Sequence, residues 1–264
     1  MSAGTDKILK PRPHPPALAH GELEQVLENI WFVTGTIDMF SGKPCLQMKF
    51  SRNMVVLRQN KDELILVNSL RLDEHGLQAL DALGTVQHVI RLGAFHGSDD
   101  AFYKERYPSA TVWAIEGMTY FPGFDTKSQT IYFQADKIMN STTKDFPVVK
   151  SSLIVIESKP PKDGILVLER PEGKVFITGD SLQNFETCDE YFNCLARISM
   201  KPMGFICPCN VGPAWAKVVN VQQEEMHKLL THKFDHVLPT HGRPVLGQAW
   251  KRYEPAITRM KTKK

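Results

Sequence analysis

The sequence contains no apolar stretch that approaches the roughly 20 residues needed to cross a bilayer. Its first residues, M-S-A-G-T-D-K, also lack the apolar core of a secretory signal. These two absences argue against a membrane protein and against a secreted one. We therefore expect a globular protein of the cytoplasm.

Cysteine is scarce, with five residues among 264. In a reducing compartment they would be free thiols rather than a disulfide framework. Four of them follow the spacing C-x5-C and then C-P-C, which differs from the C-x2-C pairs of common structural zinc sites. They are Cys188, Cys194, Cys207 and Cys209. The spacing favours buried or loop thiols, with a structural zinc cluster as the alternative, and it assigns them no role.

Positive and negative side chains nearly balance over most of the chain. The net charge is +3, and the last fourteen residues carry six basic side chains against one acid, which leaves −2 for residues 1–250. A basic tail on a near-neutral body argues against a nucleic-acid-binding face and favours a solvated helix end. We expect a small-molecule partner and neither nucleic acid nor a membrane. Nothing in the sequence indicates the oligomeric state.

Prolines concentrate at the N-terminus, where the letters K-P-R-P-H-P-P begin at Lys10. Each proline removes a backbone donor and fixes φ, which disfavours regular structure. Residues 1–22 are therefore predicted to form a flexible arm. The remaining residues, 23–264, are predicted to form one domain that begins near Leu23 with a helical turn.

Apolar runs separated by polar breaks predict an antiparallel meander in the first part of the domain. The expected strands are residues 30–33, 45–50, 54–58 and 64–68, with R-N and N-K-D-E as breaks. Helical spacing of apolar residues then predicts helices at residues 73–83 and 100–107. Each is followed by an apolar run that predicts a strand, at residues 86–92 and 111–115.

The second half repeats this order of strands followed by helices. Strands are expected at residues 151–158, 164–170, 174–179 and 236–239, and helices at 221–232 and from about 245. Sheet followed by helix, occurring twice, predicts two sheets packed face to face with helices outside. The expected fold is thus an α/β protein, a four-layer αβ/βα sandwich.

Polar residues suited to metal binding follow three of the predicted strands. His96 and Asp100 occur in G-A-F-H-G-S-D-D, Asp180 in F-I-T-G-D-S-L-Q-N, and His241 in L-P-T-H-G-R-P. Imidazole and carboxylate groups that converge from separate strand ends are typical ligands of a divalent metal. The sequence therefore predicts a polar pocket at one edge of the sandwich.

The order of these motifs along residues 28–250 resembles the metallo-β-lactamase-fold superfamily, whose ligands come from H-x-H-x-D-H, a lone His, an Asp after a strand and a terminal His. His96 and Asp100 match the first His and the Asp of the motif, and Asp180 and His241 match the later two positions. The motif is degenerate, because Ser98 and Ala101 replace its other imidazoles.

Two further positions depart from the pattern that the resemblance implies. The region of the lone His offers Glu157 or Ser158, and Asn68 replaces a supporting Asp. One of the two usual metal sites thus keeps a single strong ligand, whereas the other keeps Asp100, Asp180 and His241. The resemblance implies one divalent ion on these three residues, with His96 as a fourth ligand or a neighbour. Zinc is the first expectation, and iron or manganese could compete.

The function implied by the resemblance is metal-dependent hydrolysis of an ester, lactone, thioester or phosphoester by an activated water molecule. Asp99 is expected to support the site as a hydrogen-bond acceptor, and Tyr103 to stabilise an oxyanion. Asp99 and Asp100 could instead favour the start of the helix at 100–107 as capping residues.

Two alternatives remain open from the sequence. The missing imidazoles favour a metal-free pseudoenzyme or binding protein on the same fold. The letters G-D-S-L at residues 179–182 resemble the nucleophile block of serine esterases, with Ser181 as the nucleophile. The partner pattern D-x-x-H of that block is absent around His241, which makes this second alternative the weaker one.

Overall fold

The computed structural model describes residues 14, 16–39, 47–118, 120, 131–157 and 162–260. Apolar strands in the N-terminal part assemble into a seven-stranded sheet in the order β1-β2-β3-β4-β5-β6-β7. They are β1 (Glu24–Leu27), β2 (Ile30–Met39), β3 (Met48–Gln59), β4 (Glu63–Val67), β5 (Thr85–Arg91), β6 (Thr111–Ile115) and β7 (Lys137–Met139). Strands β1 to β4 are antiparallel neighbours, whereas β4 to β7 are parallel ones.

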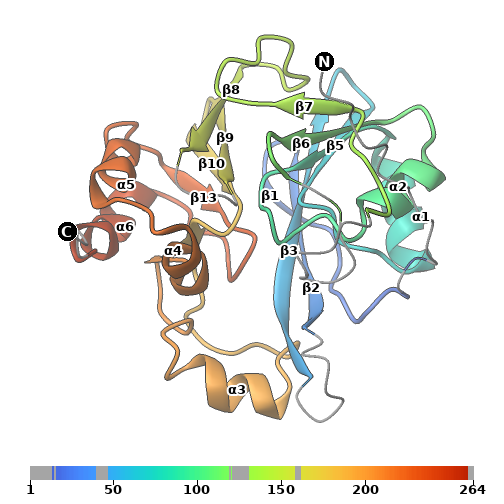
Figure 1. Ribbon diagram of the computed structural model, residues 1–264. Helices are drawn as coiled ribbons and strands as arrows, with labels where there is room; N and C mark the ends of the chain where they lie inside the picture. The colour runs from blue at the N-terminus through green and yellow to red at the C-terminus, as the bar shows by residue number, and fades with distance from the viewer. Residues whose placement is uncertain are drawn as a thin grey trace, which may run out of the picture.

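A second, four-stranded sheet has the order β13-β10-β9-β8. It consists of β8 (Ser151–Ile156), β9 (Asp163–Arg170), β10 (Gly173–Thr178) and β13 (His236–Leu238), and a short separate pair consists of β11 (Leu182–Gln183) and β12 (Asn210–Val211). The helices are α1 (Glu74–Leu83), α2 (Asp100–Arg106), α3 (Cys194–Met200), α4 (Pro213–Val219), α5 (Gln223–Leu230) and α6 (Ala249–Thr258). Helices α1 and α2 cover the outer face of the first sheet, and α4, α5 and α6 cover that of the second (Figure 1).

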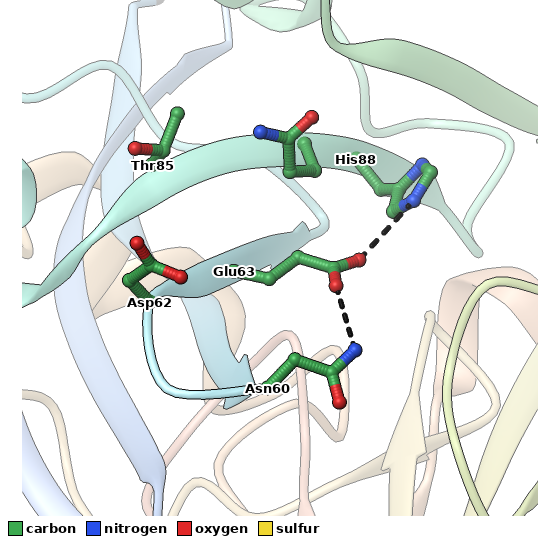
Figure 2. A pocket seen from close by; sticks show the side chains of 6 residues that line it. Asn60, Asp62, Glu63, Thr85 and His88 are labelled. Atoms are coloured by element: carbon green, nitrogen blue, oxygen red, sulfur yellow. Dashed lines mark hydrogen bonds and ion pairs between the residues drawn. The ribbon is translucent and has the colours of Figure 1, made fainter.

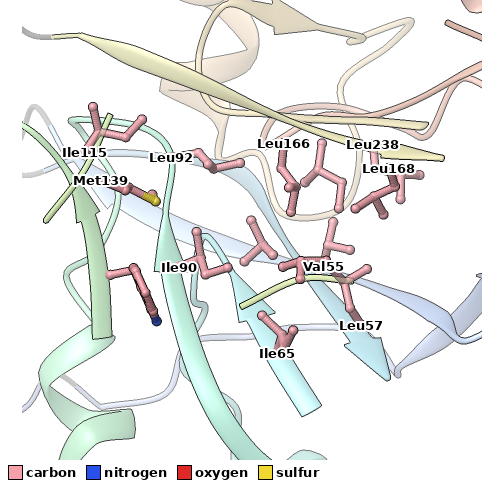
Figure 3. Close-up of a cluster of buried hydrophobic side chains, with 14 of the residues drawn as sticks. Val55, Leu57, Ile65, Ile90, Leu92, Ile115, Met139, Leu166, Leu168 and Leu238 are labelled. Atoms are coloured by element: carbon pink, nitrogen blue, oxygen red, sulfur yellow. The ribbon is translucent and has the colours of Figure 1, made fainter. Parts of the chain in front are cut away.

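Period-two alternation explains why the strands stack into four layers. In β4, Ile65 and Val67 face the other sheet, whereas Leu64 and Leu66 face α1 and α2. The second sheet behaves alike, since Leu166 of β9 points to the first sheet and contributes to the cluster in Figure 3. A strand that is buried on both faces needs apolar residues at successive positions. The predicted four-layer αβ/βα sandwich is therefore confirmed.

Several predicted boundaries were wrong. Residues 24–27 form a strand instead of a helical turn, and β3 is one 12-residue strand rather than two. The supposed break, Arg52 and Asn53, lies inside β3 because both side chains have buried partners in other segments. Residues 45 and 46 of the predicted strand lie outside the described residues.

The C-terminal helices also differ from prediction. The helix predicted at 221–232 is present as α5, Gln223–Leu230, whereas α4, Pro213–Val219, was not predicted, and α6 begins at Ala249 rather than near residue 245. The short helix α3 was not predicted. Within the described residues, no helix has the length and apolar character that crossing a bilayer requires.

The described part of the predicted N-terminal arm runs along β2. The amide of Gly21 donates to the carbonyl of Thr34 at 2.8 Å, and the amide of Thr36 donates to the carbonyl of Ala19 at 2.9 Å. Residues 19–21 are thus hydrogen-bonded to the first sheet. The division of the chain at residue 22 stays a prediction, because residues 1–13 and 15 lie outside the described part.

Candidate functional site

The carboxyl ends of β5, β10 and β13 carry three side chains that meet at one edge of the sandwich. His96 follows β5, Asp180 follows β10, and His241 follows β13. One ligand atom from each residue lies within 4.8 Å of those of the other two. Because β10 and β13 are parallel neighbours, their carboxyl ends share an edge, and β5 approaches that edge from the first sheet.

The three side chains form a compact and buried group. The Nε2 atom of His96 lies 3.2 Å from Oδ2 of Asp180, and Nε2 of His241 lies 3.3 Å from Oδ1. The two imidazole rings are 5.0 Å apart between centroids. His96, Asp180 and His241 are only 3%, 6% and 5% exposed. Asp180 therefore lies between two imidazoles in a setting largely closed to solvent.

Backbone contacts hold two of the three residues. Nδ1 of His241 donates to the carbonyl oxygen of Ser51 at 2.9 Å, which leaves Nε2 as the nitrogen that faces Asp180. Asp163, at the start of β9, accepts the amides of Asp180 at 3.1 Å and Ser181 at 2.8 Å. Both contacts fix the direction in which a ligand atom points.

Several buried atoms of the group have no hydrogen-bond partner in the described residues. They are Nδ1 and Nε2 of His96 and Oδ2 of Asp180. His96 Nε2 is close to Asp180 Oδ2, but the two are not aligned as a hydrogen bond. Buried polar atoms in native proteins are almost always satisfied by protein, water or an ion. Unsatisfied imidazole and carboxylate atoms that face one another fit a divalent cation.

Electrostatics also favour the forms that bind a metal. Burial lowers the pKa of His96, although the neighbouring Asp180 opposes that shift. Burial would raise the pKa of Asp180, but the adjacent imidazoles of His96 and His241 outweigh it and the net shift is downward. Burial and the charge of Asp180 raise the pKa of Asp163 to about 8. The central carboxylate is thus ionised and its neighbour Asp163 is the protonated one near pH 7.

Asp100 does not join this group, although the sequence predicted it as a ligand. Its carboxylate accepts hydrogen bonds from Ser69 Oγ and from the Tyr120 hydroxyl, both at 2.6 Å. The side chain is fully buried, and burial raises its pKa against the effect of these two donors. Its oxygens are therefore engaged in holding the loop before α2.

Asp99 and Tyr103, the other predicted site residues, are also engaged elsewhere. Asp99 forms an ion pair with Arg52 and accepts the amide of Arg71 at 3.0 Å. It is the residue before α2, but its side chain makes no capping bond. The Tyr103 hydroxyl donates to the Leu70 carbonyl at 2.7 Å inside the core, which leaves it no free donor for an oxyanion.

Close packing shapes the loop that carries His96. Arg91 donates Nε to the carbonyl of Gly93 at 3.1 Å, and it also bonds the carbonyl of Ala94. A Cβ atom at Gly93 would lie 2.7 Å from Cδ2 of His96 and 3.4 Å from Oδ2 of Asp180. Only glycine fits beside the imidazole at this point.

Asn68 joins the strand ends behind the site. Its amide nitrogen donates to the Thr178 carbonyl at 3.0 Å and to the Thr240 hydroxyl at 2.7 Å, while its oxygen accepts the Leu92 amide at 2.9 Å. An aspartate here could not donate to a carbonyl oxygen. The departure from the family pattern at this position thus has a structural reason.

The remaining sequence candidates do not add a described ligand. The hydroxyl of Ser181 is buried and has no hydrogen-bond partner in the described residues, so no base is bonded to it there. Ser158 lies outside the described residues, and Glu157 pairs with Lys162 at 2.6 Å. The four cysteines named above are free thiols. Where the structure describes the chain, the group of His96, Asp180 and His241 is the one set of His, Cys, Asp and Glu that could hold a metal.

Sequence reasoning missed Asp163 and the aromatic residues around His241. Asp163 lies one residue before the strand predicted at 164–170, and its contact with the turn at 180–181 depends on the tertiary fold. The rings of Phe50 and Phe185 lie 5.5 and 5.8 Å from that of His241. No local signal distinguished these phenylalanines from core residues.

A separate polar cavity of about 380 Å³ lies at the opposite ends of β4 and β5 (Figure 2). It is lined by Asn60, Asp62, Glu63, Thr85, Gln87 and His88. The Glu63 carboxylate accepts from Gln59 and Asn60, each at 2.9 Å, and lies 3.5 Å from His88 Nε2. This satisfied carboxylate contrasts with Asp180 and makes the cavity the weaker candidate for function.

Solved structures resemble the chain along nearly its whole length. No protein-family model matches the sequence, and no curated protein matches it. A metallo-β-lactamase from Hirschia baltica is 16% identical with a TM-score of 0.54, covering 91% of this chain and 98% of that one. One from Pontibacter korlensis is 12% identical with a TM-score of 0.55, covering 90% and 99%. A Pseudomonas aeruginosa enzyme in its mono-zinc form is 10% identical with a TM-score of 0.52, covering 94% and 97%.

These matches and the four layers define the fold class. The chain has the metallo-β-lactamase fold, as the motif order predicted.

Proposed function

We propose that this protein is a hydrolase whose centre holds one divalent metal ion on His96, Asp180 and His241. The observation that carries the proposal is the set of unpartnered, buried ligand atoms, which converge within 4.8 Å from three separate strand ends. The mono-zinc form of a structural neighbour is a precedent on the same fold. The expected setting is the cytoplasm, where the free thiols would stay reduced.

The donor set favours a single ion with open positions. Two imidazoles and one carboxylate occur in zinc hydrolases and in non-haem iron sites, so zinc is our first candidate and iron or manganese the alternatives. A second ion would need further ligands nearby. The two acids that follow His96 in sequence, Asp99 and Asp100, are already engaged with Arg52, Ser69 and Tyr120.

The side chains of the site would prepare it for hydrolysis. His241 is oriented by the Ser51 carbonyl, and burial shifts the pKa of His96 downward, toward the neutral form that binds a metal. When bound, a divalent ion polarises the scissile carbonyl or phosphoryl group and lowers the pKa of a water molecule toward about 7. The rings of Phe50 and Phe185 exclude bulk water from the side of His241. The substrate is a small ester, lactone, thioester or phosphoester.

Metal content and hydrolysis test the proposal together. Zinc, iron and manganese are measured by elemental analysis in protein purified without added metal, from the wild type, Asp180→Asn and Asp100→Asn. We expect about one equivalent in the wild type and in Asp100→Asn, and little in Asp180→Asn. Hydrolysis of p-nitrophenyl acetate, γ-butyrolactone, a thioester and bis(p-nitrophenyl) phosphate is then followed in the same three proteins.

A metal-free binding protein is the second candidate. One observation favours it: the carboxylate of Asp100 is bonded to Ser69 and Tyr120 and is not part of the group. Three potential ligands therefore remain among the described residues. Wild-type protein that remains without metal after incubation with zinc, iron and manganese would support this candidate and contradict the hydrolase. Metal lost equally from Asp100→Asn would instead restore Asp100 as a ligand.

A further inference from the structure

The segment between β11 and β12 forms a lobe outside the four layers. Residues 184–209, which we call the lobe, leave the sandwich and return to it, and they carry α3. Figure 1 shows α3 apart from both helical layers, beside the start of β3, where Ser199 contacts Met48. The pairs Leu182–Val211 and Gln183–Asn210 hold the two ends of the lobe together.

The lobe contacts His241 at its base. The amide of Asn184 donates to the His241 carbonyl at 3.0 Å, and the ring of Phe185 lies 5.8 Å from the imidazole. Phe192 packs on Phe185 at 5.3 Å and on Phe50 at 6.1 Å. These rings form an apolar cover over one side of the imidazole. His241 is 5% exposed under it.

The lobe is also linked to the same histidine through Ser51, which contacts Asp189. The Ser51 hydroxyl donates to Oδ2 of Asp189 in the lobe at 2.6 Å. The carbonyl of the same residue accepts from Nδ1 of His241 at 2.9 Å. One residue of β3 therefore contacts the lobe with its side chain and the imidazole with its backbone.

Other bonds attach the lobe to β3 without contacting a member of the metal-binding group. The amide of Asn193 donates to the Lys49 carbonyl at 3.0 Å, and its side chain donates to the Gln47 carbonyl at 2.8 Å. The Ser199 hydroxyl approaches the Met48 sulfur at 3.3 Å. The lobe is thus held against β3 by these polar contacts and by a buried apolar cluster of Phe50, Phe185, Phe192, Ala196 and Met200.

We propose that the lobe is a cover for the metal centre and that Ser51 is a positioning residue which links closure of the lobe to the orientation of His241. The inference rests on the proposed metal site. Closing the lobe holds the Ser51 carbonyl in line with Nδ1 and so directs Nε2 toward the ion. By linkage, metal binding must stabilise the closed lobe by the same factor by which closure strengthens metal binding.

Zinc affinity and hydrogen exchange of the lobe amides test the proposal in the full-length protein. Ser51→Ala removes the hydroxyl and keeps the backbone carbonyl. We expect it to weaken zinc binding about 3- to 10-fold, in line with the net loss of one hydrogen bond. Zinc should slow exchange at residues 186–200 in the wild type, and it should slow it less in Ser51→Ala.

The matched control is Ser199→Ala, which removes another serine hydroxyl between the lobe and β3. It should leave zinc affinity within about twofold of the wild type. Asp189→Ala tests the same link from the lobe side and should reproduce Ser51→Ala, should the β3 variant fail to fold. Asp189→Asn should restore most of the affinity, because its amide can donate to the Ser51 oxygen.

The outcomes separate this inference from the proposed function. Zinc that binds the wild type and both alanine variants with equal affinity would overturn the link through Ser51 and leave the metal centre intact. Zinc binding without any change in the hydrogen exchange of the lobe amides would overturn the proposal that the lobe covers the metal centre, and it would leave the metal centre itself intact. A wild type that binds no zinc, iron or manganese would overturn both proposals.

Discussion

Two sets of buried polar side chains meet in one loop, where Asp99 and Asp100 follow His96 by three and four residues, and they differ in how their hydrogen bonds are satisfied. Asp99 and Asp100 are only 2% and 0% exposed, and their carboxylates have partners in Arg52, Ser69 and Tyr120. His96 is 3% exposed, and neither of its ring nitrogens has a hydrogen-bond partner in the described residues. The same loop therefore carries a satisfied set and an unsatisfied one.

This difference separates scaffold from site. A fully satisfied buried network stabilises and specifies one conformation, whereas an isolated unsatisfied group is costly unless a ligand completes it. The acids Asp99 and Asp100 fix the start of α2 and the loop before it through their partners. His96, in the same loop, instead faces Asp180 and His241 at the edge of the sandwich.

The largest effect is expected from breaking the satisfied set at Arg52. In Arg52→Met, the carboxylate of Asp99 remains buried without its cation, and loss of one partner from a buried ion pair typically costs about 3–5 kcal/mol. We expect the free energy of unfolding in urea to fall by that amount, with about one metal still bound per folded chain. Adding Asp99→Asn should recover part of the loss. Loss of metal without loss of stability would contradict the assignment of Arg52 to the scaffold.

Gly93→Ala should damage the unsatisfied set. The new Cβ would lie 2.7 Å from His96 Cδ2, so the imidazole must shift away from Asp180. Displacing the support of a metal ligand usually costs about 10- to 100-fold in affinity. Zinc competition against a chromophoric chelator measures this loss. Gly117→Ala is the control for backbone strain without a local clash, since its φ is +84° and no atom lies within 4 Å of its Cβ position; an equal loss of zinc affinity there would argue against a local effect at His96.

The fold was predictable from sequence to the extent that burial is periodic. Runs such as Leu64–Val67 are apolar at every position because both faces of the strand are covered, which identifies interior strands. Arg52 and Asn53 were misread as a turn, because polar residues in a strand look like a break until their distant partners are known. The same limit hid α3, whose seven residues form a short helix on a lobe.

The sequence predicted which strand ends carry the site residues, but it did not predict the hydrogen-bond partners of those residues. His96, Asp180 and His241 each follow a strand, and the topology brings them together. Asp100 matched a family position equally well, yet its partners come from Ser69, before α1, and Tyr120, after β6. Sequence spacing cannot show that a hydroxyl 31 positions away occupies a carboxylate.

A smaller effect should follow from Tyr120→Phe, which tests the satisfied set at Asp100. The substitution removes a 2.6 Å hydrogen bond from a buried carboxylate and keeps the ring that stacks on Arg91. We expect a loss of about 1–2 kcal/mol in the free energy of unfolding, with unchanged metal content. Tyr107→Phe breaks a 2.6 Å bond to Asp81 at an exposed position and should cost less than about 0.5 kcal/mol. An equal loss of unfolding free energy in the two variants would contradict the claim that the buried hydrogen bond of Asp100 contributes more to stability than the exposed one of Asp81.

The smallest effect concerns His88, a histidine with partners at the opposite end of the first sheet. Its Nδ1 accepts from the Trp113 indole at 3.2 Å, and burial lowers its pKa below 6.5 although Glu63 opposes the shift. A lowered pKa in the folded state means that this contribution to stability is complete above pH 6.5 and is lost as the pH falls through 6.5 toward the folded value.

Stability between pH 7.5 and 5.5 should accordingly decline slightly less in His88→Gln than in the wild type. Histidine NMR signals sharpen the comparison, because zinc should move the resonances of His96 and His241 and leave the titration of His88 unchanged. A His88 titration that changes on adding zinc would mean that the two ends of β5 are coupled, or that the ion binds at the Glu63 end instead. Since the His88 side chain is 21% exposed, water screens part of its charge, and the pH effect remains the weakest of the series.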